Sequence, residues 1–307
     1  MSMPSNCRVI SSTRDAVGEC PVWSVVEQAL YWVDIDGRLL HRWDWATQQQ
    51  RSWPTPERIG CFALTAQGVV VAAMESGIFA LTLGAAPQLT AQRLVSITHP
   101  VPDMRFNDGR CDRQGRFWVS TMCMDRNPPK TVGAVYCFDG QTLSAPQVER
   151  LITPNGMAFS LDGCTMFLSD SDPSVQTIWN FDFDATAGAL SNRRVFVDMR
   201  ALPGRPDGAA VDSEDHYWIC GNDAGLVHRF SPAGVLVQSF AVPAPKPAMC
   251  AFGGPNLDVL FVTSIMPASS DPAFVQDSGA VFALQVGVCG VAEPLFQGPL
   301  GAAGNLV

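Results

Sequence analysis

The sequence lacks the short motifs of several common enzyme classes, and it has little charge. Charged residues make up only 16% of its 307 positions. It contains no G-x-S-x-G nucleophile elbow, no H-E-x-x-H zinc motif, and neither a G-x-x-x-x-G-K-[ST] phosphate loop nor a G-x-G-x-x-G dinucleotide motif. These absences argue against a serine hydrolase built on that elbow, a zinc protease of that type, and enzymes that bind nucleotides through such loops.

Signals of secretion, membrane insertion and nucleic-acid binding are also missing. The N-terminal stretch MSMPSNCRVISSTRD has no apolar signal-peptide segment, and apolar runs such as GVVVAAM are too short to cross a bilayer. The ten cysteines are scattered without any C-x-x-C, which favours free thiols in a reducing compartment. The net charge is −9 and no basic stripe is visible. We therefore expect a cytoplasmic protein without nucleic-acid or membrane partners, and we predict no protein partner.

What the sequence does contain favours short strands joined by tight turns. Hydrophobic residues make up 47% of the chain, with 26 glycines and 23 prolines. The stretch PNGMAFSLDG holds two hairpin-turn signals, Asn155-Gly156 and Asp162-Gly163, because these residue types tolerate positive φ. This composition predicts an all-β protein.

One pattern recurs six times along the chain. A starting residue is followed eight positions later by a turn residue, and then by an apolar strand that usually carries an aromatic residue. The repeat spacing is about 40 to 50 residues, which is typical of the four-stranded blades of a propeller. The six starting positions are Glu19, Gly60, Asn107, Asn155, Asp207 and Ala248.

The repeats predict one six-bladed β-propeller domain spanning residues 1–307, with four antiparallel strands per blade. Five of the six third strands begin at a glycine, as in GIFALTL and GAVYCFD, and the last fourth-strand candidate is EPLFQG near the C-terminus. The leftover N-terminal CRVIS is expected to pair with the last blade and close the ring. The eight tryptophans fall mainly inside strands, so we interpret them as core between blades.

The six starting residues should ring the central channel at similar depth, because the first strand of each blade lines it. Four of them, Glu19, Asn107, Asn155 and Asp207, offer side-chain oxygen. Asparagine and aspartate also serve turns, and that alternative stays open for Asn155. Four oxygen groups converging from four blades would repel one another or lack partners without a cation between them. The pattern therefore predicts one divalent metal ion in the channel, of the type of Ca²⁺, Mg²⁺ or Mn²⁺, with Zn²⁺ also possible.

The motifs GECPVW, RFNDG, PNGMAFSLDG and RPDGAAVD, in this order, resemble the gluconolactonase/regucalcin (senescence-marker protein) family of six-bladed propellers. The resemblance covers almost the entire chain. It implies that Glu19, Asn155 and Asp207 hold the metal, that Asp207 is the general base, and that Arg105 and Asn107 contact substrate. Asp125 aligns with a further acidic substrate contact of the family, and the segment 125–133 is either a rim of the channel or an ordinary surface loop.

The resemblance further implies a metal-dependent hydrolase that opens sugar (aldono-) lactones to aldonic acids. The metal would polarise the lactone carbonyl, and Asp207 would accept the proton of the attacking water. Two other functions stay open from the residues alone. One is a propeller hydrolase of other esters or phosphotriesters, and the other is a non-catalytic propeller that binds calcium or a protein.

Overall fold

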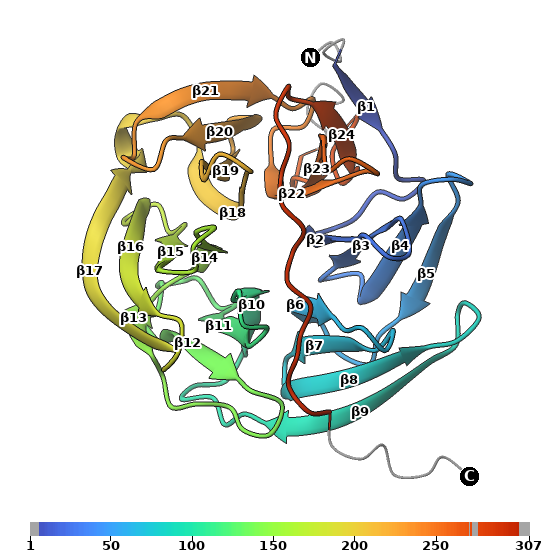
Figure 1. Ribbon diagram of the computed structural model, residues 1–307, viewed down its shortest axis with the longest axis horizontal. Helices are drawn as coiled ribbons and strands as arrows, with labels where there is room; N and C mark the ends of the chain where they lie inside the picture. Colours follow the sequence, from blue (N-terminus) through green and yellow to red (C-terminus); the bar gives the residue numbers. More distant parts are fainter. Residues whose placement is uncertain (1–5, 270, 272–275, 301–307) are drawn as a thin grey trace.

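The computed structural model describes residues 6–300 apart from 270 and 272–275, and these residues form a ring of six sheets (Figure 1). Each sheet has four antiparallel strands that follow one another from the inside of the ring to the outside. The predicted six-bladed β-propeller is therefore confirmed. Among the described residues no helix is long and apolar enough to cross a membrane.

The strands of the first five blades follow the chain order. Blade 1 contains β2 (Gly18–Ser24), β3 (Ala29–Asp34), β4 (Leu39–Asp44) and β5 (Gln50–Pro54); blade 2 contains β6 (Ile59–Leu64), β7 (Val70–Met74), β8 (Gly77–Leu83) and β9 (Leu89–Ser96); blade 3 contains β10 (Met104–Cys111), β11 (Phe117–Cys123), β12 (Gly133–Phe138) and β13 (Val148–Leu151). Blade 4 contains β14 (Pro154–Phe159), β15 (Thr165–Asp170), β16 (Thr177–Asp184) and β17 (Ala189–Asp198), followed by the short 3₁₀ helix η1 (Met199–Ala201); blade 5 contains β18 (Arg205–Val211), β19 (Tyr217–Asn222), β20 (Leu226–Phe230) and β21 (Leu236–Ala241).

Blade 6 joins the two ends of the chain. Its innermost strand is β22 (Pro247–Gly253), followed outward by β23 (Val259–Ser264) and β24 (Phe282–Gln285). Its outer strand is β1 (Cys7–Val9), which pairs with β24. The expected closure by CRVIS is thus confirmed. The pairing completes the fourth strand of blade 6 and ties the N-terminal part of the chain to the last blade.

The expectation that EPLFQG (293–298) forms the fourth strand of the last blade is wrong. These residues belong to a C-terminal strap, residues 286–300, which runs across the ring from blade 6 toward blades 2 and 3 (Figure 1). The strap is fixed by backbone hydrogen bonds from Phe296 to Leu64 and from Gln297 to Gly115, at 2.8 and 3.0 Å. The outer position of blade 6 is already taken by β1, and the strap forms only isolated bridges, from Phe296 to Thr65 and from Gly290 to Asp212.

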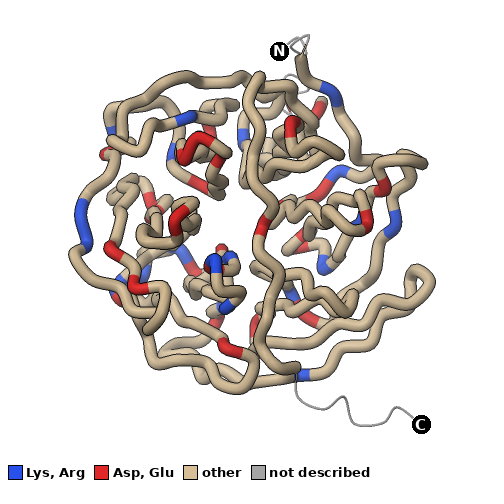
Figure 2. Tube along the Cα trace, viewed as in Figure 1, with Lys and Arg blue, Asp and Glu red and all other residues tan. Residues whose placement is uncertain are grey.

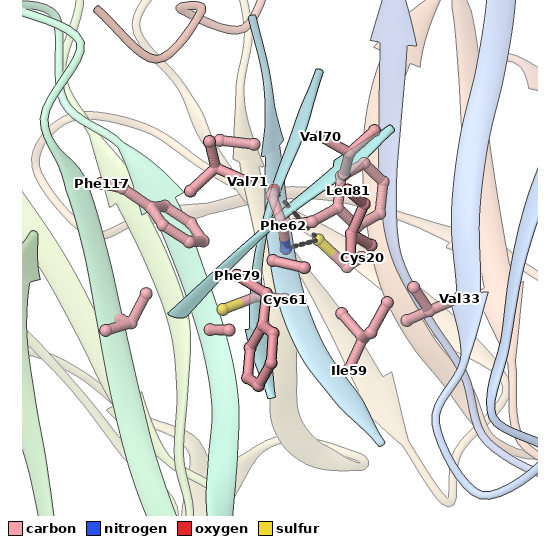
Figure 3. Close-up of a cluster of buried hydrophobic side chains, with 14 of the residues drawn as sticks. Cys20, Val33, Ile59, Cys61, Phe62, Val70, Val71, Phe79, Leu81 and Phe117 are labelled. Atoms are coloured by element: carbon pink, nitrogen blue, oxygen red, sulfur yellow. Dashed lines mark hydrogen bonds between the residues drawn. The ribbon is translucent and has the colours of Figure 1, made fainter. Parts of the chain in front are cut away.

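The core lies between neighbouring blades, as the repeat pattern requires. Figure 3 shows one cluster in which Cys20 of β2 lies beside Phe62 of β6, while Phe117 of β11 packs from the opposite side of blade 2. The Cys20 thiol donates to the carbonyl oxygen of Phe62 at 3.7 Å. Fully buried tryptophans confirm the interpretation of this residue type as core. Trp118 and Trp218 each donate the indole N–H to an aspartate six positions earlier, so burial leaves no polar atom of these two side chains unpaired.

Each inner strand changes register with its neighbour at or next to its starting position. The shifts fall between Glu19 and Val22, between Asn155 and Ala158, and at equivalent places in the other four blades. Such bulges turn side chains away from the regular strand alternation. The hairpin interpretation of Asn155-Gly156 is wrong for this reason. Gly156 has a φ of 63°, but it lies within β14, whereas Asp162-Gly163 does form the turn before β15.

Candidate metal and substrate site

Four predicted side chains meet at the end of the ring where the inner strands begin, which we call the site end. They are Glu19 from β2, Asn107 from β10, Asn155 from β14 and Asp207 from β18. Asn107, Asn155 and Asp207 are 6–8% exposed, and Glu19 is partly exposed. Gly60 and Ala248, the two starting residues without side-chain oxygen, occupy the same place on β6 and β22. The repeat therefore brings oxygen atoms from four blades toward the axis.

Asn155 is held in one orientation by a direct contact to blade 3 and, through Ser171, by a link to blade 5. Asn107 donates from Nδ2 to Oδ1 of Asn155 and to the carbonyl oxygen of Pro154, each at 2.8 Å. Asn155 in turn donates from Nδ2 to the hydroxyl of Ser171 at 2.7 Å. That hydroxyl donates onward to the carbonyl oxygen of Pro206. The side chain of Asn155 therefore links blades 3, 4 and 5 and does more than serve a turn.

Asp207 has one oxygen engaged and one without a hydrogen bond among the described residues. Asn222 donates from Nδ2 to Oδ2 of Asp207 at 2.6 Å. Burial raises the pKa of Asp207 to about 7, although the hydrogen bond from Asn222 and the charge of Arg205 oppose that rise. A buried carboxylate with a free oxygen is suited to bind a cation or to accept a proton.

Glu19 lies close enough to Asp207 for the two carboxylates to repel each other. Burial raises the pKa of Glu19 well above its ordinary value, and the charges of Asp207 and Asp108 raise it further. Among the described residues neither Glu19 nor Asp207 forms an ion pair with an arginine or lysine. Two unneutralised carboxylates and an asparagine amide form a donor set that fits one hard divalent cation.

Few side chains at the site end could bind a metal ion. Among the described residues, no group of three or more His, Cys, Asp or Glu side chains is arranged to hold a metal ion. The third protein donor at this place would be the amide oxygen of Asn155.

Arg105 and Asn107, the predicted substrate contacts, lie together on β10. Arg105 donates from Nη1 to Oδ1 of Asn107 at 2.7 Å and to the carbonyl oxygen of Phe106 at 2.8 Å. The Arg105 side chain is half-buried and forms no ion pair with a described residue. Burial lowers its pKa, opposed by the nearby charges of Asp36 and Glu19. An unpaired guanidinium next to the carboxylates could bind substrate oxygens.

Asp125 is the first residue of the loop 125–133. Its carboxylate pairs with Lys130 within the same exposed loop and is 47% exposed, and no hydrogen bond joins it to the four converging side chains. The loop 125–133 is attached to blade 4 through Arg126, which contacts the carboxylate of Asp172 at 3.3 Å.

Three side chains that support the site were not singled out from the sequence. Asp108 accepts backbone hydrogen bonds from Gly109 and Met157, at 2.8 and 2.7 Å, and so connects blades 3 and 4. Ser171 and Asn222 stand at equivalent places, at the ends of β15 and β19, where they hold Asn155 and Asp207. Polar residues at the ends of second strands were the available signal, because those ends lie beside the starts of the inner strands.

A sequence profile of the SMP-30/gluconolactonase/LRE-like region matches residues 17–266. The chain belongs to this family. It is 39% identical over 284 residues to a 6-deoxy-6-sulfogluconolactonase of Pseudomonas putida, covering 92% of this chain and 95% of the relative. It is 34% identical over 300 residues to an L-arabinolactonase of Azospirillum brasilense, covering 94% and 95%.

Solved structures agree with this assignment. The fold matches a calcium-binding protein, regucalcin, from Agrobacterium tumefaciens with a TM-score of 0.86 at 27% identity, covering 94% of this chain and 97% of that one. The family therefore includes sugar lactonases as well as a calcium-binding propeller, and the resemblance inferred from the motifs is confirmed.

Proposed function

We propose that this protein is a metal-dependent lactonase that hydrolyses sugar lactones to aldonic acids. The observation that carries the proposal is the convergence of Glu19, Asn155 and Asp207 from three blades onto one buried place, with no basic side chain of the described residues paired to either carboxylate. The lactonases among the relatives support the reaction class, since they match this chain over more than nine-tenths of its length.

Glu19, Asn155 and Asp207 would hold one divalent cation, and Ca²⁺, Mg²⁺, Mn²⁺ and Zn²⁺ are the candidates. When bound, such an ion polarises a carbonyl group and lowers the pKa of a nearby water. The calcium-binding relative supports a divalent cation without selecting one. Ser171 and Asn107 keep the Asn155 amide in position for this role.

The remaining steps fall to side chains of the chain itself. Asp207 accepts a proton from the water that adds to the lactone carbonyl carbon, and Asn222 keeps its carboxylate in place. The bond between that carbon and the ring oxygen then breaks, and the ring oxygen takes up a proton to become a hydroxyl. Arg105 and Asn107 bind hydroxyl or carbonyl oxygens of the sugar. We further propose a cytoplasmic location, since all ten cysteines are free thiols.

The test is acid release from a panel of five- and six-carbon aldonolactones, with simple esters and phosphotriesters included. The protein is stripped with chelator and resupplied with each cation in turn. We expect lactone opening only with metal, and its loss in Asp207→Asn and Glu19→Gln. The matched control is Asp182→Asn, an exposed carboxylate on β16 that should leave the rate unchanged. Opening of esters or phosphotriesters alone would replace the proposal by the alternative hydrolase, and no turnover of any compound would favour a binding propeller.

A further inference from the structure

We propose that the site end carries a subsite for a negatively charged group on the lactone, formed by Arg205 and Lys246. This inference rests on the proposed function and narrows its substrate class. A lactone with a sulfonate, phosphate or carboxylate on its terminal carbon would place that group beside the two cations, next to the Asp223 carboxylate that they share.

Both cations stand at the site end, on adjacent blades. Arg205 is the first residue of β18, two positions before Asp207, and Lys246 directly precedes β22. Asp223, which directly follows β19, lies between them. Arg205 contacts Oδ2 of Asp223 through Nε, and Lys246 contacts Oδ1 of the same carboxylate through Nζ, both at 2.6 Å.

Arg205 is held in position by the residues that also hold the proposed metal ligands. Its Nη1 donates to the carbonyl oxygen of Ser171 at 3.1 Å, and its Nη2 lies 3.5 Å from Oδ1 of Asn222. Ser171 supports Asn155, and Asn222 supports Asp207. The guanidinium therefore lies one side chain away from the place where the lactone carbonyl would react. A substituent several bonds from that carbonyl carbon could reach it.

The charges at this place do not balance. Two cations share the single carboxylate of Asp223, and their side chains are 25% and 30% exposed. Two further arginines lie near this place, and only one of them is neutralised by a carboxylate. Arg126 is paired with Asp172, while Arg105 has no carboxylate partner among the described residues. Glu19 and Asp207 would be neutralised by a divalent cation bound between them. The charge of Asp108, which also acts on both carboxylates, is opposed by Arg110.

This local surplus is opposite in sign to the protein as a whole, whose net charge is −9. Figure 2 shows acidic and basic positions both occurring toward the centre of the ring. An anionic substrate is repelled by the acidic surface elsewhere on the protein and attracted by a locally positive place, so such a place would concentrate the substrate there. Arginine and lysine together suit an oxyanion, because the guanidinium offers several N–H donors and the ammonium adds a point charge.

The experiment compares kcat/KM for lactones that differ only at the terminal carbon. Glucono-1,5-lactone is paired with its 6-phospho and 6-sulfo analogues, and the metal-loaded full-length protein is assayed at low and high ionic strength. We expect the wild type to prefer the anionic lactones by about tenfold or more, since a charge-assisted hydrogen bond of ordinary strength gives such a factor. The preference should shrink as salt is added.

Lys246→Met should lower the ratio of anionic to neutral kcat/KM by about tenfold, through KM. Arg205→Lys, which keeps the charge, should preserve most of the ratio. The matched control is Arg194→Gln, an exposed cation on β17 that is paired with Asp182 and lies outside the site end; it should leave both rates unchanged.

A wild type that opens neutral and anionic lactones equally well would overturn the subsite while leaving the lactonase intact. The subsite would also be overturned if Lys246→Met reduced both rates alike, because the lysine would then make no distinction between charged and neutral substrates. Absence of any lactone opening would instead reject the proposed function.

Discussion

The side-chain amide of Asn107 on blade 3 donates to Oδ1 of Asn155 on blade 4 at 2.8 Å. This bond crosses the blade boundary and fixes which end of the Asn155 amide is oxygen. A metal ligand is usually oriented by such a partner. The relationship therefore gives Asn107 a positioning role in addition to its proposed contact with substrate.

Asn107→Ala is expected to weaken metal binding by roughly 10- to 100-fold, because the Asn155 amide loses the donor that orients it. The metal concentration that gives half-maximal activity should rise by that factor, and circular dichroism should show an intact fold. Asn192→Ala removes an exposed amide that hydrogen-bonds Asp182, and serves as the control. An unchanged metal requirement in Asn107→Ala would show that the hydrogen bond from Asn107 does not orient the Asn155 amide for metal binding.

Chelation should destabilise the wild type and reveal the repulsion between Glu19 and Asp207. A cation that binds only the folded protein raises the melting temperature as its concentration rises above Kd. In Glu19→Gln, added metal should no longer raise the melting temperature. In chelator, however, Glu19→Gln should melt at a higher temperature than the wild type, because one of two repelling carboxylates is gone. Thermal scans with and without metal test this, and a lower melting temperature of Glu19→Gln in both conditions would contradict it.

The ion pair between Arg110 on β10 and Glu293 of the C-terminal strap should be costly to break from one side. The two side chains are 7% and 15% exposed, and Arg110 also donates to the carbonyl oxygens of Met157 and Ala209. Glu293→Leu leaves a buried guanidinium unpaired, and we expect a loss of about 3–5 kcal/mol in the free energy of unfolding. The double variant Arg110→Met/Glu293→Leu should lose less. Urea unfolding measures both, and equal or greater loss in the double variant would show that the pair itself stabilises the fold.

Acidification should destabilise the protein partly through His228. Its ring is fully buried, with Nδ1 near the hydroxyl of Ser239 and Nε2 near the carbonyl oxygen of Pro203. Burial lowers the pKa of His228, while the Pro203 carbonyl opposes that shift. The unfolded chain therefore takes up a proton at higher pH than the folded protein does, and stability falls as the pH drops below about 6.5.

His228→Gln should weaken this pH dependence, although the lost packing should also lower the melting temperature at neutral pH. The measurement is the melting temperature of both proteins at a series of pH values from neutral to mildly acidic. The difference between their slopes isolates the contribution of His228. Parallel curves would show that the histidine does not titrate differently on unfolding.

The repeat was sufficient to predict the ring, because each blade carries its own local pattern of turn residue and apolar strand. It also placed Glu19, Asn107, Asn155 and Asp207 near the starts of the innermost strands, and the structure has all four there, at or next to the register shifts. The same local pattern misled at Asn155-Gly156, since a bulge and a hairpin turn both use a glycine at positive φ. It misled again at residues 293–298, where an apolar segment resembles a strand but the fourth position of blade 6 is filled by β1.

Partners that lie on different blades could not be predicted from local pattern. Ser171 reaches Pro206, and Arg110 reaches Glu293, across long stretches of sequence. Nothing in the sequence around Glu293 marks it as the partner of a buried arginine. Such contacts depend on how the blades pack, and a repeat alignment records only what the blades share.

The way blade 6 closes the ring has a consequence for biosynthesis. Its outer strand β1 is translated before every strand of the first five blades, whereas its partner β24, which ends at Gln285, is translated after them. While the nascent chain grows, β1 has no partner, and blade 1 has no sixth blade to pack against. Sheets of the first five blades can assemble in order as they leave the ribosome, but the circle cannot shut until β24 has been translated. A premature stop codon anywhere before β24 would therefore release an open arc with two uncovered flanks, and cellular proteolysis would be expected to remove it.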